Sequence, residues 1–426
     1  MNRKEFLKGM AAVVGGLAVP GTVRAADLRT ALQDASVSSD AAFWKLVRDE
    51  FVLDPGWSYL NFGGLGTCPM PVLNSFWEWT RTEERAPSAG HDEKVWWSVK
   101  ERLAKLLGPS CRKEDVALIG CATEGVNAII NGLPLKKGDE VITSTHEHVA
   151  VNVGLLNRMQ RDGIVIRLFE PDLARAQGNV DRISALVGPR TRLIFVSHVT
   201  CTTGQLFPAA EIAKLARSRN IWFAMDGAQA PVCVPFDIVE TGVDFYTSST
   251  HKWLMGPKRT GFLYVRQGML DTLRPVTAGA YSSERNDIGK LDLSLHPTAQ
   301  RYEYGTQNDA LFFALGAAID FVDTIGMPRI WQHNHALAEK FYRGLQEIAG
   351  VEILSPQEEA YRTAMISFRM KNHTYAQINE HLAKAKIRAR PVTEGGLDCI
   401  RVSFHVCNHD PEVDGILAAL RALASA

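Results

Sequence analysis

The sequence predicts an α/β protein with a large domain, whose mainly parallel seven-stranded sheet is flanked by helices, and a small C-terminal α+β domain. Two observations predict this class. Short apolar runs of strand length alternate with stretches that carry apolar residues at helical spacing, which is typical of βαβ units. After residue 308 the pattern changes to two long helices, followed by closely spaced strands and helices. The change in pattern indicates a second, smaller domain.

Seven apolar runs are expected to form the large sheet. In chain order they are Val116–Gly120, Glu140–Ser144, Ile164–Phe169, Leu193–Val199, Ile221–Met225, Phe245–Ser249 and Gly261–Arg266. Apolar residues at helical spacing predict the helices between them: Thr123–Leu133, Ala150–Arg161 and Ala209–Arg219. The C-terminal part predicts two long helices within Asn308–Gly350, a helix over Tyr375–Lys386, a strand over Cys399–His405 and a final helix from about Asp410. We expect residues 60–310 to form the large domain, and residues 27–59 with 311–426 to form the small domain.

Residues 1–26 have the features of a signal peptide. A basic start (Arg3, Lys4, Lys8) precedes the apolar run Met10–Pro20, and small residues stand before a possible cleavage site after Ala25. The start resembles a twin-arginine signal in which Lys4 replaces the second arginine. This segment predicts a periplasmic or exported protein. The alternative is a cytoplasmic protein with an amphipathic N-terminus.

Composition and spacing disfavour several classes of protein. Lys plus Arg and Asp plus Glu both number 47, so the net charge is zero, whereas a nucleic-acid-binding surface needs a basic excess. No apolar run approaches the roughly 18 residues that a membrane span requires. The seven cysteines are scattered without a CxxC pair, which disfavours a disulfide framework or a zinc site. His146 and His148 could form a metal pair, but no third ligand is evident, so no metal site is expected.

Polar side chains directly follow several of the predicted strands. In open parallel sheets, ligands bind at the carboxyl ends of the strands, so these side chains are candidates for one site. They are Thr123, Glu124, His146, His148, Thr200, Thr203, Asp226, Gln229, His251 and Lys252.

Three of these features together point to pyridoxal 5′-phosphate (PLP). A buried lysine such as Lys252 can form a Schiff base with an aldehyde cofactor, and Asp226 can face the pyridine nitrogen. The turn Gly120–Gly125, from strand into helix, offers backbone N–H groups to a phosphate, and Ser249 and His251 offer further donors. Each feature also has a simpler explanation. Lys252 could be an exposed loop lysine, Asp226 a loop acid, and the turn Gly120–Gly125 an ordinary helix cap.

The motifs that contain these residues resemble the class V aminotransferase family of PLP-dependent enzymes. They are Asp226-Gly-Ala-Gln229, Ser249-Thr-His251-Lys252, Arg301-Tyr-Glu-Tyr-Gly305-Thr306-Gln-Asn308, the pair Glu147-His148 and the turn Ala122-Thr123-Glu124. The resemblance covers roughly residues 55–420 and is nearest to isopenicillin N epimerase-like and cysteine desulfurase-like members. It implies the PLP transferase fold (fold type I) and PLP as the cofactor.

The resemblance also implies a role for each residue. Lys252 would form the internal aldimine and act as acid or base at Cα, Asp226 would pair with the ring nitrogen, and His148 would stack on the ring. The further cofactor-binding residues would be Ala122, Thr123, Thr200, Gln229, Ser249, His251 and, from the neighbouring subunit of a homodimer, Thr306. Arg401 would bind the substrate α-carboxylate. Asn61, in the segment Tyr59–Thr67, is also expected to contact substrate.

The reaction itself stays open among several classes. We favour an epimerase or aminotransferase acting at Cα of an amino acid. A C–S lyase or cysteine desulfurase-like enzyme and a non-catalytic PLP-binding protein are the alternatives. A desulfurase needs a cysteine on the loop before the carboxylate arginine, and the loop Arg388–Gly396 has none. Arg388 and Arg390 on this loop either bind a second acidic group or are solvated surface charges. Specificity would also depend on the loop Ala278–Arg285.

Overall fold

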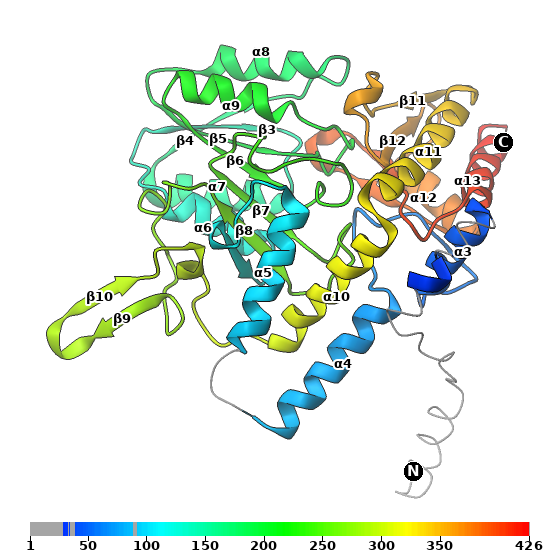
Figure 1. Ribbon diagram of the computed structural model, residues 1–426. Coiled ribbons are helices and arrows are strands. Elements are labelled where there is room, and N and C mark those ends of the chain that lie inside the picture. The colour runs from blue at the N-terminus through cyan, green and yellow to red at the C-terminus, as the bar shows by residue number, and fades with distance from the viewer. Residues whose placement is uncertain (1–28, 33, 35–38, 88–91, 426) are drawn as a thin grey trace, which may run out of the picture.

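The computed structural model describes residues 29–32, 34, 39–87 and 92–425, so the predicted signal peptide, residues 1–26, lies outside the described residues. The predicted fold class is confirmed (Figure 1). The large sheet has seven strands in the order β2-β8-β7-β6-β5-β3-β4, and only β8 runs antiparallel to its neighbours. The strands are β2 Val116–Ile119, β3 Glu140–Ser144, β4 Val165–Phe169, β5 Thr191–Ser197, β6 Trp222–Asp226, β7 Phe245–Ser249 and β8 Gly261–Val265.

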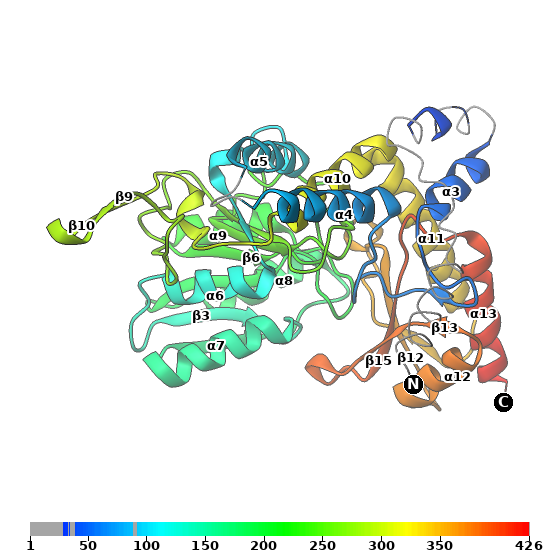
Figure 2. The ribbon, with the colours of Figure 1, turned by 90° about the horizontal axis from the view of Figure 1, so that it is seen from below.

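Helices cover both faces of this sheet because its strands are apolar on both sides. Alternate side chains of a strand point to opposite faces. Leu193 and Phe195 pack in one core with α6 and α7, whereas Ile194 and Val196 pack in another core with α5, α8, α9 and α10. The helices are α4 Met70–Arg85, α5 Glu93–Leu107, α6 Ala122–Gly132, α7 Val149–Asp162, α8 Ala176–Leu186, α9 Ala209–Ser218 and α10 Asp309–Ile325. This three-layer arrangement is visible in Figure 2.

The C-terminal part forms a second sheet with its own core. Its four antiparallel strands run in the order β11-β12-β15-β14 and pack against three helices and a core of buried side chains such as Phe341, Phe368 and Leu420. The elements are α11 Met327–Gln346, β11 Val351–Ile353, β12 Met365–Met370, α12 Tyr375–Lys384, β14 Arg390–Val392, β15 Cys399–Ser403 and α13 Asp410–Ala424. The N-terminal helix α3, Asp40–Asp49, contacts this part through the stacked rings of Trp44 and His333.

Two features were not expected from the sequence. Part of the predicted loop Ala278–Arg285 belongs to a hairpin, β9 Ser283–Asp287 with β10 Asp292–Leu295, which projects from the body of the molecule (Figure 1). β9 contains no apolar residue, and β10 alternates over only four residues, so the sequence gives little indication of either strand. In addition, β1 Ser58–Tyr59 pairs with β13 Ile387–Arg388 and ties the N-terminal segment to the small sheet.

Within the described part of the chain, we find no single helix with the length and apolar character of a membrane span. The helices α10 and α11 reach the length and apolar character of a span only when they are counted together, and the chain bends by 78° between them.

Candidate active site

A small cavity lies at the carboxyl ends of the central strands, where the large sheet meets the small one. Its empty volume is about 190 Å³. The lining residues come from β5, β6 and the loops that follow β3, β5, β6 and β7: His148, Ser197, Val199, Cys201, Asp226, Ala228, Gln229 and Lys252. The cavity therefore brings together four of the residues predicted from the sequence, namely His148, Asp226, Gln229 and Lys252.

Asp226 provides a buried carboxylate at the end of the central strand β6. It is 4% exposed, and its Oδ1 accepts a hydrogen bond of 2.8 Å from the backbone N–H of Ala228. Its neighbours β5 and β7 both run parallel to β6, so the carboxylate is held at the middle of the sheet edge. A buried carboxylate needs a charged or donating partner, and a protonated ring nitrogen would be one.

Lys252 follows β7 and points its amine into the same cavity. The residue is 8% exposed. Burial lowers the pKa of Lys252, and the charge of Asp226 offsets part of that effect. A larger fraction of the amine is therefore neutral at a given pH than for a lysine in water. A neutral amine is the nucleophilic form and also the form that can accept a proton.

His148 stands at the start of α7, beside a buried acid that the sequence reading did not select. The His148 Nδ1 accepts a hydrogen bond of 3.2 Å from the backbone N–H of Ala150. Burial, with the charge of Lys252, lowers the pKa of His148, which favours the neutral ring. Glu147 is fully buried, and its carboxyl accepts hydrogen bonds of 2.5 and 2.6 Å from the hydroxyls of Ser144 and Ser197. Burial raises the pKa of Glu147 to about 7.

Donors for an anion gather at the start of α6. The backbone N–H of Ala122 donates to the Ser249 hydroxyl at 2.8 Å, which joins the lysine loop to this helix. Thr123 is exposed in the first turn of α6, where the helix dipole favours an anion. Two residues after Ser249, His251 has a buried Nδ1 without a hydrogen-bond partner. Burial lowers the pKa of His251 to about 4.

Arg401 and Asn61 lie together between the two sheets. Arg401 is 1% exposed, its Nη2 donates to the Asn61 Oδ1 at 3.2 Å, and its Nη1 donates to the carbonyl of Cys201. The Nε of Arg401 is buried without a partner. Burial and the charge of Arg390 lower the pKa of Arg401 to about 10. A buried guanidinium with an unused donor is suited to bind a carboxylate.

The glycine-rich segment after Asn61 is required by close packing between the lysine loop and Arg401. The Gly66 N–H donates to the carbonyl of His251 at 2.9 Å, and a Cβ at Gly66 would lie 2.5 Å from the carbonyl oxygen of Lys252. A Cβ at Gly63 would lie 2.7 Å from the Met365 sulfur. The side chain of Gln229 donates to the Gly63 carbonyl at 2.7 Å.

Eight predicted residues do not line the cavity: Asn61, Ala122, Thr123, Ser249, His251 and Arg401, described above, together with Thr200 and Thr306. The Thr200 hydroxyl is bonded to the Thr203 hydroxyl at 2.9 Å and accepts from the Gln205 N–H at 3.0 Å, so it serves the turn after β5. Thr306 is exposed between Tyr302 and α10. Its predicted contact requires a second subunit and stays a prediction.

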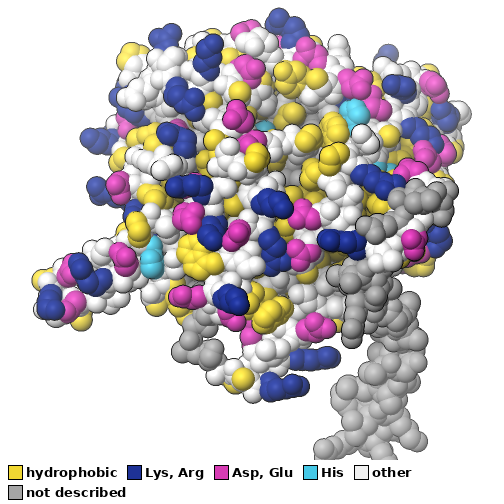
Figure 3. All heavy atoms as spheres, in the orientation of Figure 1, with side chains coloured by type: hydrophobic (Ala, Val, Ile, Leu, Met, Phe, Trp, Pro, Cys, Tyr) yellow, Lys and Arg dark blue, Asp and Glu magenta, His cyan; other side chains and the backbone are white. Residues whose placement is uncertain are grey.

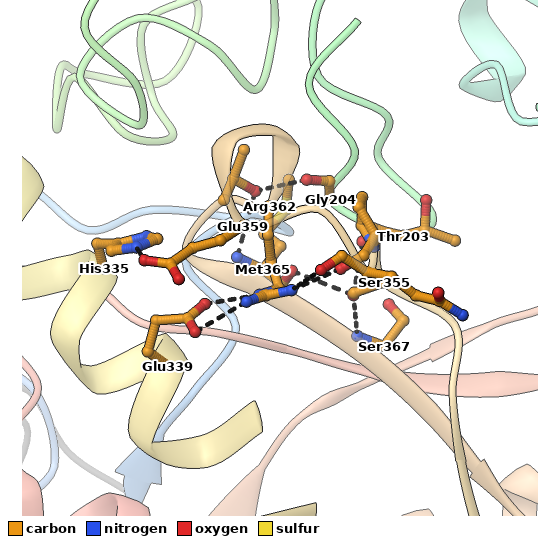
Figure 4. Close-up of polar contacts among 12 residues, drawn as sticks. Thr203, Gly204, His335, Glu339, Ser355, Glu359, Arg362, Met365 and Ser367 are labelled. Carbon is orange, nitrogen blue, oxygen red and sulfur yellow. Dashed lines mark hydrogen bonds and ion pairs between the residues drawn. The ribbon is translucent and has the colours of Figure 1, made fainter. Parts of the chain in front are cut away.

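A buried network fixes the small sheet against the loop after β5. The hydroxyls of Ser355, Ser367 and Thr363 donate to the carbonyls of Thr203, Thr202 and Gly204 at 2.7, 2.6 and 2.8 Å (Figure 4). Beside them, Arg362 forms a bidentate pair with Glu339 on α11 at 2.6 and 2.8 Å. Because the same loop holds Arg401 through Cys201, the network sets the position of this guanidinium relative to the cavity.

Sequence reasoning missed several residues of the site. Ser197 and Cys201 line the cavity but were not predicted as site residues. The prediction extended β5 to Val199, whereas the strand ends at Ser197, so Ser197 was treated as lying inside the strand and not at its end. Cys201 is 3% exposed, and burial raises the pKa of its thiol to about 11. The signal that could have found Ser197 and Glu147 was their position at strand ends beside residues already selected.

Comparisons with known proteins show the family and the fold of the chain. The family model described as Aminotransferase class-V matches residues 86–419. Isopenicillin N epimerase from Amycolatopsis lactamdurans is 30% identical over 409 residues, covering 90% of this chain and 99% of that protein. A probable cysteine desulfurase from Methanothermobacter thermautotrophicus is 26% identical over 389 residues, covering 86% and 94%. A solved structure of a C-DES variant with glycine covalently linked to its PLP cofactor has a TM-score of 0.81 at 24% identity, covering 88% of this chain and 98% of that one.

Proposed function

The chain belongs to the class V aminotransferase family of PLP-dependent enzymes, and from this premise we propose that it moves the Cα proton of an amino acid, as an epimerase. Transamination is the second candidate, because it uses the same groups. The observation that supports proton transfer most is the pairing of a buried amine and a buried carboxylate in one cavity, Lys252 with Asp226. The similarity to isopenicillin N epimerase over nearly its whole length favours epimerisation.

The residues present fit the cofactor. Asp226 offers an acceptor for a ring N–H, and Lys252 offers an amine for the aldehyde. The unpartnered Nδ1 of His251 and the first turn of α6, next to Ser249, offer what a phosphate needs. When bound, PLP supplies an electron-withdrawing ring that acidifies the Cα–H of an attached amino acid.

Each side chain then has a defined task in the proposal. Lys252 would take the Cα proton of the bound amino acid, and inversion at Cα would require a proton to return on the opposite face. The lowered pKa of Lys252 increases the fraction of the neutral, proton-accepting amine. Asp226 would keep a proton on the ring nitrogen. His148, favoured as a neutral imidazole, would contact the ring, and Arg401 would bind the α-carboxylate.

The thiols of the chain disfavour the desulfurase alternative. A desulfurase needs a thiolate that can attack the substrate sulfur. Cys201 lines the cavity, but burial raises the pKa of its thiol to about 11. Cys399, two residues before Arg401, is fully buried within β15, and burial raises the pKa of its thiol to about 12. Neither thiol is poised as a nucleophile.

The test is to incubate the PLP-loaded protein with L- and D-amino acids in D₂O. We expect deuterium at Cα, observed by NMR, together with loss of optical purity and without release of thiol or pyruvate. Conversion to a keto acid would instead show transamination, and release of thiol or pyruvate would show a lyase. Bound PLP without any Cα exchange across the panel would leave a non-catalytic binding protein and contradict the proposal.

We also propose that the chain works as a homodimer with Thr306 near the partner's phosphate site. One face of α7 is apolar but exposed: Val149, Val153 and Leu156 are 54%, 58% and 47% exposed. Their spacing places them in one stripe of the helix. The projecting hairpin also exposes Ile288 and Leu291, at 90% and 88%. Figure 3 shows charged side chains of both signs along this hairpin. Exposed apolar stripes of this kind are typical of subunit contacts.

Light scattering after gel filtration tests the dimer. Wild type is expected to have twice the mass of one chain, and Val153→Asp is expected to raise the dimer dissociation constant at least about tenfold, because a charge would be buried. Ser184→Asp, at an exposed position on α8 across the sheet from α7, is the matched control and should remain dimeric. A monomeric wild-type protein that retains full activity would contradict the proposal.

A further inference from the structure

Two arginines stand directly opposite each other beside the cavity. Arg390 on β14 is the cross-strand partner of Arg401 on β15. Residues in such a position share one face of a sheet, with Cβ atoms about 5 Å apart, and two like charges there destabilise the pair. The charge of Arg390 contributes, after burial, to lowering the pKa of Arg401. An anion between or beside the two guanidiniums would stabilise such a pair.

Both guanidiniums also keep an unused buried donor. The Nη1 of Arg390 and the Nε of Arg401 have no hydrogen-bond partner within the described part of the protein. An unsatisfied buried donor on a charged group destabilises the fold. Such groups in a native structure call for a ligand or a catalytic role. A substrate α-carboxylate bound to Arg401 would accept a hydrogen bond from that guanidinium and would leave the Nη1 donor of Arg390 without a partner.

The carboxylates nearby do not fill this need. Glu394 forms an ion pair with the Nη2 of Arg390, and its Oε2 accepts from the Thr393 N–H at 3.1 Å. This contact holds one edge of the guanidinium and leaves the Nη1 edge unused. Asp226 lines the cavity with Lys252, and its charge acts on the pKa of that amine. The charges that act on Lys252 include both Arg401 and Arg390, so the second arginine belongs to the same electrostatic environment.

The loop that holds Glu394 is built to stay beside the cavity. Gly395 and Gly396 have φ values of 64° and 68°, which side chains rarely adopt. A Cβ at Gly395 would lie 3.1 Å from the carbonyl oxygen of Thr145 and 3.2 Å from the ring of His146. The loop therefore packs against the turn that leads to His148, and it orients Arg390 from the small sheet toward the large one.

We propose that Arg390 binds a second carboxylate of the substrate, so that the enzyme acts on amino acids with an acidic side chain in preference to neutral ones. Arg401 binds the α-carboxylate, and the Nη1 edge of Arg390 binds the side-chain carboxylate, while Glu394 fixes the orientation of Arg390. This inference rests on the proposed function for the identity of the reacting end of the substrate. It adds the class of substrate to that function.

The first measurement does not depend on catalysis. Binding of glutarate and of butyrate to the PLP-loaded protein is compared by calorimetry, because they resemble acidic and neutral substrates without an amine. Wild type is expected to bind glutarate at least about tenfold more tightly, and Arg390→Gln is expected to lose this preference. Arg388→Gln is the matched control. Arg388 is exposed, with its guanidinium 5.2 Å from the ring of Trp57, and its replacement should leave the preference unchanged.

The second measurement compares Cα–deuterium exchange of glutamate and aspartate with that of glutamine and asparagine. Arg390→Gln is expected to lower kcat/KM for the acids by about 10- to 100-fold, mainly through KM, and to change the values for the amides less than about threefold. An equal loss for acids and amides would show that Arg390 only positions the loop, and would overturn the inference. Equal wild-type rates for acids and amides would also overturn it, although the proposed function would stand. Selective glutarate binding without Cα exchange would contradict the proposed function alone.

Discussion

Replacing Lys252 with alanine is expected to lower kcat for Cα proton exchange by at least about 10³-fold, even with PLP in excess. A positioned general acid or base contributes about 10²- to 10⁴-fold to a rate, and Lys252 also carries the attachment to the cofactor. The amine is buried in the cavity that contains Asp226, and burial lowers its pKa. Among the residues that the structure describes, no other lysine lines this cavity. The measurement is deuterium exchange at Cα by NMR, with cofactor content measured on the same samples.

Lys258→Ala is the matched control for this experiment. Lys258 lies six residues further along the chain and is exposed, so its loss should change kcat by less than about twofold. A Lys252→Ala protein that is folded and keeps a tenth or more of the wild-type kcat would contradict the assignment of Lys252. Circular dichroism of both variants separates loss of chemistry from loss of fold.

Asp226→Asn is expected to lower kcat by about 10²- to 10³-fold while PLP remains bound. Removing one partner of a buried, hydrogen-bonded charge pair costs about 2–5 kcal/mol, and each 1.36 kcal/mol is a factor of ten in rate. The asparagine Oδ1 can still accept the Ala228 N–H, so the local backbone is preserved. A neutral amide, however, cannot hold a proton on the ring nitrogen. The expected result is therefore a folded, PLP-loaded protein with slow Cα exchange.

Asp244→Asn is a matched control for that variant. Asp244 is also buried, but it pairs with Arg266 at 2.7 Å, away from the residues that line the cavity. Its replacement is expected to reduce stability and leave kcat of the folded protein within about threefold of wild type. If Asp226→Asn kept kcat within tenfold of wild type, the pairing of Asp226 with the ring would be wrong.

The sheet and the center of the site could be predicted from the sequence because both follow from local patterns. The runs Glu140–Ser144 and Phe245–Ser249 are strands with the predicted bounds, and every residue in both is buried, as expected for strands covered on both faces. Asp226 and Lys252 were selected because each follows such a run, and parallel strands bring those ends to one edge.

The part of the site that comes from the small sheet depends on contacts between segments distant in the sequence, which no local pattern predicts. The opposition of Arg390 and Arg401 is a matter of strand register, which the sequence of β14 does not fix. Arg390 was therefore left open between a substrate contact and a surface charge. Thr200 was selected by the same strand-end rule that found Asp226, but its hydroxyl bonds within its own turn, as Thr hydroxyls often do.

The most direct test of the central claim is to reduce the PLP-loaded protein with borohydride and locate the modified residue by peptide mass spectrometry. The cavity predicts that the phosphopyridoxyl group is found on Lys252 alone, at close to one group per chain. Modification of a different lysine, or a protein that binds PLP without any reducible attachment, would contradict the claim that Lys252 carries the cofactor.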